Sequence, residues 1–351
     1  MKNHQAVCAL LAIGLATSLQ ARAGNYTFTP LGSINGTSSA ANAINDQGQV
    51  VGVSDRSAVV WNGSTPTLLA GLSGSDQQGS YATNINNAGQ IVGVNGWNGA
   101  AVWNGNTQTA LGPIQGSGSF AWGINNAGQV AGMSDQGQAV VWNNATSTFL
   151  SPGGGKAYAV NNAGLVAGCL CSPDQYASQA VVWNDGTVIV LGGQWGSSNG
   201  SAALAINDAG QVAGYGNFHA SLVPVVWNGT TPTILPTLSG LPSKAKAIND
   251  EGQIVGFSAG HAVLWSGGSL TDLNQFLGAQ DKAAGWYLQT ANDINDFGVI
   301  VGTEVNSLTG ATRAFELSPV PEPGSFGLAL AGLGLLGFVA RRKRRSVESK
   351  T

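Results

Sequence analysis

Residues 41–52 read A-N-A-I-N-D-Q-G-Q-V-V-G, and the phrase A-x-x-I-N-[ND]-x-G-x-[VI]-x-G occurs seven times in the chain, once with Val in place of Ile. The anchoring Asn residues follow one another at intervals of 41, 39, 36, 46, 42 and 46 residues. A period near 40 residues that survives small insertions indicates one supersecondary unit copied along the chain. The anchors are Asn45, Asn86, Asn125, Asn161, Asn207, Asn249 and Asn295.

Each phrase predicts a β-hairpin. The N-[ND]-x-G stretch stands between two apolar runs, and Asn, Asp and Gly are the residues that tight turns prefer, because Gly can take a positive φ. Ala four residues before the anchor and Ile or Val directly before it fall on opposite faces of a regular strand, so we expect this strand to be buried on both sides. A second Gly, seven residues after the anchor, predicts a close approach of another backbone or sheet.

Each copy continues with a short apolar run, a turn and a last β-rich run, and four strands in about 40 residues match one propeller blade. The seventh copy ends after its third strand, at Leu317, and residues 26–31 resemble the missing fourth strand. We therefore predict an all-β, seven-bladed β-propeller over residues 24–318, closed by its N-terminal strand. An open β-solenoid with capping repeats is the alternative. Six copies end the apolar run in a Trp that we expect in the core, namely Trp61, Trp103, Trp142, Trp183, Trp227 and Trp265.

Composition narrows the possible partners. The chain is 43% hydrophobic and only 9% charged, and residues 24–318 carry six basic residues against 15 acidic ones. Because phosphate binding needs a basic surface, nucleic acid is not an expected partner. After loss of residues 1–23, two histidines remain, His219 and His261, and no metal-ligand or cofactor motif is present, so we expect neither a metal nor a cofactor.

The N-terminus reads as a secretory signal peptide over residues 1–23. Lys2 supplies the positive charge, residues 6–16 form the apolar run, and Ala21 and Ala23 form a small-x-small cleavage site ahead of Gly24. The sequence thus predicts export of the repeat region.

The C-terminal segment, residues 319–345, has three parts. The triplet Pro321, Glu322, Pro323 precedes an apolar run at 326–340, which predicts a transmembrane helix, and a short tail of residues 346–351 ends the chain. Basic residues that follow such a helix stay cytoplasmic. This basic cluster consists of Arg341, Arg342, Lys343, Arg344 and Arg345.

The triplet, apolar helix and basic end together resemble the PEP-CTERM sorting signal of Gram-negative bacteria. That resemblance implies that an exosortase in the inner membrane processes the chain near the triplet. It also implies that the processed protein then reaches the cell surface or a biofilm matrix of exopolysaccharide. The seven phrases resemble the HAF family of extracellular repeats, which implies an exported repeat protein without naming an activity.

A ligand-binding surface is predicted on the loops that follow the second and fourth strands of each repeat. These loops vary in length and carry aromatic residues outside the repeat pattern, and variable loops on a rigid scaffold commonly bind ligands. Aromatic faces suit neutral polysaccharide or a cell-surface glycan. The candidates are Trp97, Tyr176, Trp195, Phe218, His219, Trp286 and Tyr287.

Two functions remain open on these grounds. The first is a non-catalytic surface or matrix protein associated with exopolysaccharide. The second is a propeller glycosidase or lyase, which needs paired carboxylates. The candidate carboxylates are Asp174, Glu251, Asp281, Asp293 and Glu304. Cys169 and Cys171 are expected as two loop thiols or as a labile bridge, since C-L-C lacks the C-x-x-C spacing of redox sites.

Overall fold

The structure is a computed structural model that describes residues 26–320 except 37, 71–78, 97–98, 106, 112–117, 145, 152, 172–177, 194–199, 219–220 and 241. The predicted signal peptide, the triplet at 321–323, the apolar run and the basic cluster lie outside the described residues. Among the residues that are described, no helix is both long and apolar enough to cross a membrane.

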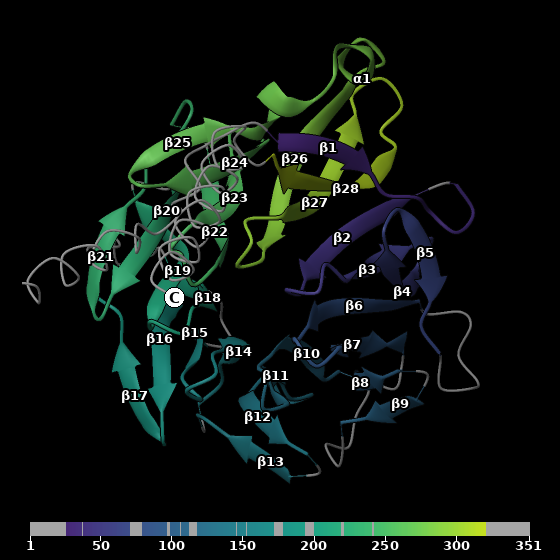
Figure 1. Ribbon diagram of the computed structural model, residues 1–351. Coiled ribbons are helices and arrows are strands. Elements are labelled where there is room, and N and C mark those ends of the chain that lie inside the picture. Colours follow the sequence, from purple (N-terminus) through teal and green to yellow (C-terminus); the bar gives the residue numbers. More distant parts are fainter. Residues whose placement is uncertain are drawn as a thin grey trace, which may run out of the picture.

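Seven four-stranded antiparallel sheets stand around a common axis, which confirms the predicted seven-bladed propeller (Figure 1). We number the blades in chain order. From the centre outwards, blade 1 contains β2 (Ser39–Ile44), β3 (Val50–Ser54), β4 (Ser57–Asn62) and β5 (Thr65–Leu68); blade 2 β6 (Ser80–Ile85), β7 (Gln90–Asn95), β8 (Ala100–Asn104) and β9 (Thr107–Ala110); blade 3 β10 (Phe120–Ile124), β11 (Gln129–Met133), β12 (Ala139–Asn143) and β13 (Thr146–Phe149). Blade 4 contains β14 (Lys156–Val160), β15 (Val166–Leu170), β16 (Gln179–Asn184) and β17 (Thr187–Val190); blade 5 β18 (Ser201–Ile206), β19 (Gln211–Phe218), β20 (Ser221–Asn228) and β21 (Thr231–Ile234). Blade 6 contains β22 (Ser243–Ile248), β23 (Ile254–Ser258), β24 (His261–Ser266) and β25 (Ser269–Asp272); blade 7 β26 (Trp286–Ile294), β27 (Ile300–Asn306), β28 (Thr312–Pro319) and β1 (Tyr26–Pro30).

The N-terminal strand closes the ring as predicted. Strand β1 pairs antiparallel with β28, in a register that sets Tyr26 opposite Pro319 and Pro30 opposite Phe315. It thereby supplies the outermost strand of blade 7, and the first and last described strands share one sheet (Figure 1). The closed ring leaves no blade without a neighbour on either side, which rules out the open solenoid.

The innermost strand of every blade contains a β-bulge, and this corrects one prediction. In blade 1 the register shifts between Ala41 and Ala43, so Asn42 has no partner in the ladder. A bulge changes the alternation of side chains by one residue. As a result, Ala41 and Ile44 pack in the same apolar cluster rather than on opposite faces, and Ala43 packs in the next one. The same pairing of Ala with Ile or Val recurs in the other six blades.

Seven apolar clusters lie between neighbouring blades and form the core. The six repeated Trp side chains are buried there, as predicted. Several of them bind, through the indole N–H, the segment that leads into their blade from the preceding one. Trp61 donates to the carbonyl of Gly32 at 2.8 Å, and Trp227 donates to that of Gly192 at 2.8 Å. An indole donor in an apolar site needs such a partner.

The second Gly of each phrase is required by backbone contact, as expected, but the contact comes from its own blade. A Cβ on Gly93 would stand 2.1 Å from the carbonyl oxygen of Tyr81, and one on Gly52 would stand 2.1 Å from that of Ala40. Both carbonyls belong to the bulged inner strand. The bulge therefore explains the Gly.

Two short helices, which the sequence did not predict, connect blades 6 and 7. They are η2 (Leu273–Phe276) and α1 (Ala279–Ala283). Asp272 caps the first by accepting a hydrogen bond from the backbone N–H of Asn274 at 2.9 Å. In blade 4, Cys169 and Cys171 form a disulfide.

Candidate functional site

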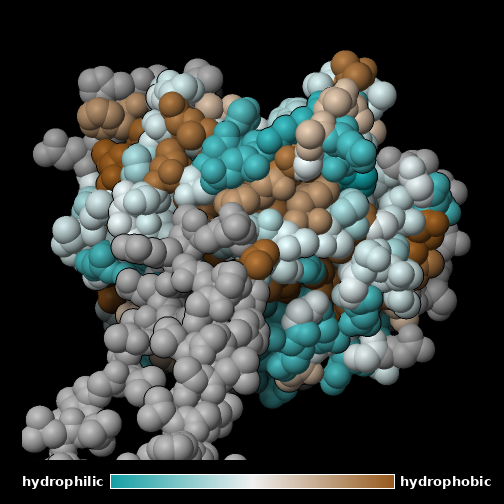
Figure 2. All heavy atoms as spheres, turned by 45° about the horizontal axis from the view of Figure 1, so that its top comes forward, coloured by the Kyte–Doolittle hydropathy of each residue, from teal (hydrophilic) through white to brown (hydrophobic). Residues whose placement is uncertain are grey.

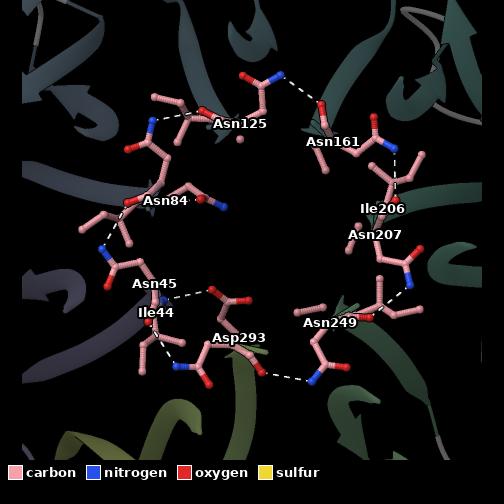
Figure 3. Close-up of a pocket in the computed structure, with 18 of the residues that line it drawn as sticks. Ile44, Asn45, Asn84, Asn125, Asn161, Ile206, Asn207, Asn249 and Asp293 are labelled. Atoms are coloured by element: carbon pink, nitrogen blue, oxygen red, sulfur yellow. Dashed lines mark hydrogen bonds between the residues drawn. The ribbon is translucent and has the colours of Figure 1, made fainter. Parts of the chain in front are cut away.

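The inner strands enclose a central cavity of about 520 Å³, and this cavity is the candidate site. Each of the seven blades contributes its inner strand and the N-[ND] dipeptide that follows it, so residues far apart in sequence line one space (Figure 3). We call the end at these dipeptides the turn end, and the end where the inner strands begin the loop end.

A closed ring of hydrogen bonds marks the turn end. Each anchor Asn donates from its side-chain Nδ2 to the backbone carbonyl of the anchor Asn in the next blade, at 2.9–3.1 Å (Figure 3). The seventh bond runs from Asn295 in blade 7 to Asn45 in blade 1. The same side chain accepts within its own turn through Oδ1, from the backbone N–H four residues later. Only an amide can donate and accept in this way, which explains why the position is Asn in every copy.

A second ring lies directly outside the first. The backbone N–H of the residue after each anchor donates to the side-chain Oδ1 of its counterpart in the next blade, at 2.8–3.1 Å. Here the side chain needs only an acceptor, so Asn and Asp serve equally. The sequence predicted turn chemistry for this dipeptide, and the structure adds that it joins the blades.

The bulged residues point into the cavity and form a layer with two chemically different halves. In blades 1, 2 and 7 they are polar and bind the next blade. Asn42 donates to the carbonyl of Ala82 at 2.7 Å, and Thr83 donates to the carbonyl of Ala121 at 2.8 Å. In blades 3, 4 and 5 the bulged residues are apolar or aromatic, namely Trp122, Tyr158 and Leu204.

Blade 6 contributes a lysine to this layer. The Lys246 ammonium donates to Oδ1 of Asn292 at 2.5 Å, and in the described part of the chain no carboxylate lies within ion-pair distance of it. Burial and, to a smaller extent, the neighbouring charge of Lys244 lower the pKa of Lys246 to about 8, against the opposing effect of Asp293. The ammonium is thus partly buried with a neutral partner, which is an unfavourable environment for a charge.

Asp293 projects into the cavity beside the first ring (Figure 3). Its Oδ2 accepts a hydrogen bond from the backbone N–H of Ile44 at 2.9 Å, and its Oδ1 accepts from that of Ile294 at 2.9 Å. Burial, with smaller contributions from the charges of Asp46 and Asp296, raises the pKa of Asp293 to about 7 despite these bonds. The carboxyl group therefore changes its charge near neutral pH.

The turn end is acidic on one side. Four of the seven residues in the outer ring are aspartates from consecutive blades, and burial together with the charges of the others raises the pKa of Asp296. The four aspartates are Asp208, Asp250, Asp296 and Asp46. Their negative charge disfavours anions at the turn end. In the described ranges no group of three or more His, Cys, Asp or Glu residues is placed to hold a metal ion.

At the loop end, Arg313 brings two of the predicted carboxylates together. Its Nε donates to Glu304 Oε1 at 2.5 Å and its Nη2 donates to Asp281 at 3.3 Å. The guanidinium also lies over the ring of Trp286, 4.4 Å from the centroid. Glu304 is fully buried, and burial raises its pKa while Arg313 opposes the rise. One face of Trp286 is therefore occupied by an internal ion-pair cluster.

The structure places only three of the predicted loop aromatics. Phe218 ends β19 and is 41% exposed, Trp286 and Tyr287 begin β26, and the ring of Tyr287 lies 6.3 Å from that of His261. His261 in turn contacts Asp272 at 2.8 Å. The other four candidates, Trp97, Tyr176, Trp195 and His219, lie outside the described residues, as does Asp174, and their role stays a prediction. In the view of Figure 2, hydrophobic residues form several separate groups between hydrophilic ones on the surface.

Sequence reasoning singled out Asp293 among the cavity residues but missed the bulged residues that line the cavity. The phrase A-x-x-I-N keeps three positions in all copies, and its first x is Trp122, Tyr158 or Lys246 in three of them. A position that varies between large aromatic and charged residues inside an otherwise constant strand was the available signal. The prediction that both strand faces are buried concealed it.

Residues 319–345 match the family model of the PEP-CTERM protein-sorting motif. A search of curated proteins found no match to the sequence. Among solved structures, virginiamycin B lyase from Staphylococcus aureus is similar, with a TM-score of 0.57 and 11% identity over 84% of this chain and 100% of that one. The extracellular domain of BT4673, assigned as a one component system, from B. thetaiotaomicron has a TM-score of 0.55 and 10% identity over 83% of this chain. This chain spans 40% of that protein's length. At such identities the similarity concerns the propeller fold alone. The sorting motif identifies an exported protein that an exosortase processes.

Proposed function

We propose that this exported propeller is a non-catalytic binding protein that associates with exopolysaccharide at the cell surface or in the extracellular matrix. The observation that carries the proposal is the sorting motif at residues 319–345, which begins where blade 7 ends at Pro319. The folded body is thus the part delivered outside the cell. It offers a polar, weakly charged surface and a cavity with aromatic walls, and both suit contact with carbohydrate.

Two candidate catalytic carboxylates are held in ion pairs, and this favours binding over catalysis. Asp281 and Glu304 are both engaged by Arg313, and Glu304 is fully buried. Such an ion-pair cluster supports the fold of blade 7 and leaves neither group free for proton transfer.

The alternative is a glycosidase or lyase, and one observation favours it. Asp293 lies in the cavity with a pKa raised to about 7, a value that suits a general acid. Incubating the chain with matrix polysaccharide distinguishes the two functions. New reducing ends or unsaturated sugars that disappear in Asp293→Asn would establish the enzyme, whereas an unchanged polymer that co-sediments with the chain is the result we expect.

Replacing Pro321 and Pro323 by Ala tests the sorting step. Proline fixes its own φ and favours an extended conformation in the residue before it, and two alanines remove these restrictions from the triplet. We expect the uncleaved variant to stay in the inner membrane, as judged by fractionation and by the mass of the chain. Pro319→Ala, just outside the triplet, is the matched control. Unchanged display of the double variant at the surface would contradict the proposed route.

A glycan array tests the loop aromatics. We expect the parent chain to bind polysaccharide fragments, and Trp195→Ala and Trp286→Ala to bind less. Because Arg313 covers one face of Trp286, the loss of this ring also frees that guanidinium, so a melting temperature must accompany each array. Failure of the parent chain to bind any glycan would remove carbohydrate from the proposal.

A further inference from the structure

The cavity is divided into an aromatic half and a basic, polar half that face each other. In a ring of seven blades, the side opposite blade 3 falls between blades 6 and 7, as the positions of Asn125, Asn249 and Asp293 in Figure 3 show. Trp122 is the bulged residue of blade 3, and Lys246 and Asn292 are those of blades 6 and 7. An aromatic wall therefore stands across the cavity from an ammonium and an amide.

In the aromatic half, three rings contact one another in a row. Trp122 lies between Phe120, at 5.7 Å and nearly parallel, and Tyr158, at 5.0 Å and tilted by 39°. Trp122 and Tyr158 line the cavity and are only partly buried. The parts of these rings that remain exposed in the cavity are suited to contact with the apolar C–H face of a sugar ring.

In the basic half, no carboxylate of the described residues forms an ion pair with Lys246, although Asp293, farther away, favours its charged form. Lys246 has Asn292 as its hydrogen-bond partner, and Lys244, two residues earlier on β22, lies over the ring of Tyr215 at 4.6 Å. Burial lowers the pKa of both lysines. A ligand carboxylate at hydrogen-bond distance would supply the ion pair that the described residues do not give Lys246.

We propose that the cavity binds a sugar that carries a carboxylate, such as a uronic acid unit, with the sugar ring against Trp122 and Tyr158 and the carboxylate on Lys246. Asp293 retains lone pairs on both oxygens and accepts from sugar hydroxyls. The cavity volume falls within the roughly 300–1,000 Å³ of ordinary ligand pockets. This inference rests on the proposed function, because it names the part of an exopolysaccharide that the propeller holds.

Calorimetric titration of the full chain in detergent tests the proposal with digalacturonate and its neutral counterpart galactobiose as probes. We expect the chain to prefer digalacturonate. Lys246→Met should weaken digalacturonate binding about tenfold or more, since a charged hydrogen bond is lost, and should change galactobiose binding by less than about twofold. Trp122→Ala should weaken both roughly tenfold, and Trp122→Phe should retain most of the binding. Lys282→Met, an exposed lysine on α1, is the matched control.

The contradicting results are specific. Equal affinity for the two probes, no binding of either, or an equal loss in Lys282→Met and Lys246→Met would overturn the proposal. A melting curve for each variant separates lost binding from lost folding. If the parent chain co-sediments with matrix polysaccharide and the cavity variants do so equally, the cavity proposal fails and the proposed function stands. If digalacturonate binds in the cavity but the chain does not associate with the matrix, the proposed function fails and the cavity site stands.

Discussion

The side chain of Asn295 in blade 7 donates a hydrogen bond to the backbone carbonyl of Asn45 in blade 1, at 3.1 Å, across a sequence separation of 250 residues. This bond is the last of seven equivalent ones and completes a ring around the cavity. Each copy of the phrase thus carries both its own turn and its link to the next blade. The closed ring fixes the inner strands, and these position the cavity residues.

Asn295→Asp should destabilise the fold, whereas Asp296→Asn at the next position should not. The first change removes the donor to Asn45 and sets a carboxylate against a carbonyl, so we expect a loss of roughly 2–3 kcal/mol in the free energy of unfolding. The second keeps the acceptor for the Asp250 N–H and removes repulsion from the neighbouring aspartates. Urea unfolding at pH 7 measures both. Equal stabilities of the two variants would refute the ring as a stabilising element.

Gly93→Ala should destabilise the fold by roughly 3 kcal/mol, because the new Cβ would meet the Tyr81 carbonyl at 2.1 Å and backbone cannot yield cheaply. Gly153→Ala is the matched control, since a Cβ there meets nothing within 4 Å. Thermal unfolding compares the two variants. A small effect of Gly93→Ala would show that the bulged strand can move away from the new Cβ. That result would contradict tight packing of the inner two strands.

Stability should depend on pH through Asp293. Its folded-state pKa of about 7 lies above the ordinary value of 3.8, so the folded chain holds the proton more tightly than the unfolded chain. The resulting stabilisation is fully present below about pH 4 and is lost as the pH rises through 7. Relative to Asp293→Asn, the free energy of unfolding of the parent chain should fall by roughly 3–4 kcal/mol between pH 4 and pH 7.5. A parallel pH dependence of the two proteins would contradict the assignment.

Arg313→Met should cost roughly 3 kcal/mol or more, because Glu304 would remain fully buried without its partner. The double variant Arg313→Met with Glu304→Leu should recover much of that loss, since neither charge then remains. Arg56→Met, at an exposed arginine in blade 1, is the control and should change stability by less than about 0.5 kcal/mol. Chemical denaturation gives all three values, and full stability in Arg313→Met alone would remove the cluster's structural role.

The repeat made the architecture predictable. Seven copies of a phrase with constant Asn, Gly and Ala positions predicted the number of blades. The additional strand at residues 26–31 predicted that the N-terminal strand closes the ring. The bulge could not be read, because an extra residue at Asn42 leaves the local pattern looking like an ordinary strand. The faces of Ala41 and Ile44 were therefore assigned wrongly. Short elements such as α1, with five residues, carry too little periodicity to be recognised.

The site was harder to predict than the fold for a physical reason. Trp122 and Lys246 occupy equivalent positions 124 residues apart in sequence, and only ring closure places them across one cavity. Nothing in either local sequence distinguishes a cavity residue from a buried one. The loop aromatics could be recognised as candidates because they lie outside the repeated pattern. The cavity residues occupy a variable position inside the repeated phrase.

A disulfide between the two ends of the propeller tests the central claim most directly, because the ring, the cavity and its two halves all depend on closure by β1. Thr27 and Ser318 are directly opposite in the β1–β28 ladder, where antiparallel partners have Cα separations of roughly 4.5–5.5 Å, within disulfide range. After mild oxidation of the variant with Thr27→Cys and Ser318→Cys, peptide mass spectrometry should find these two positions linked, and Thr27→Cys with Ser147→Cys in β13 should give no link. Absence of a link between positions 27 and 318, or equal linkage in the control, would contradict the closed propeller.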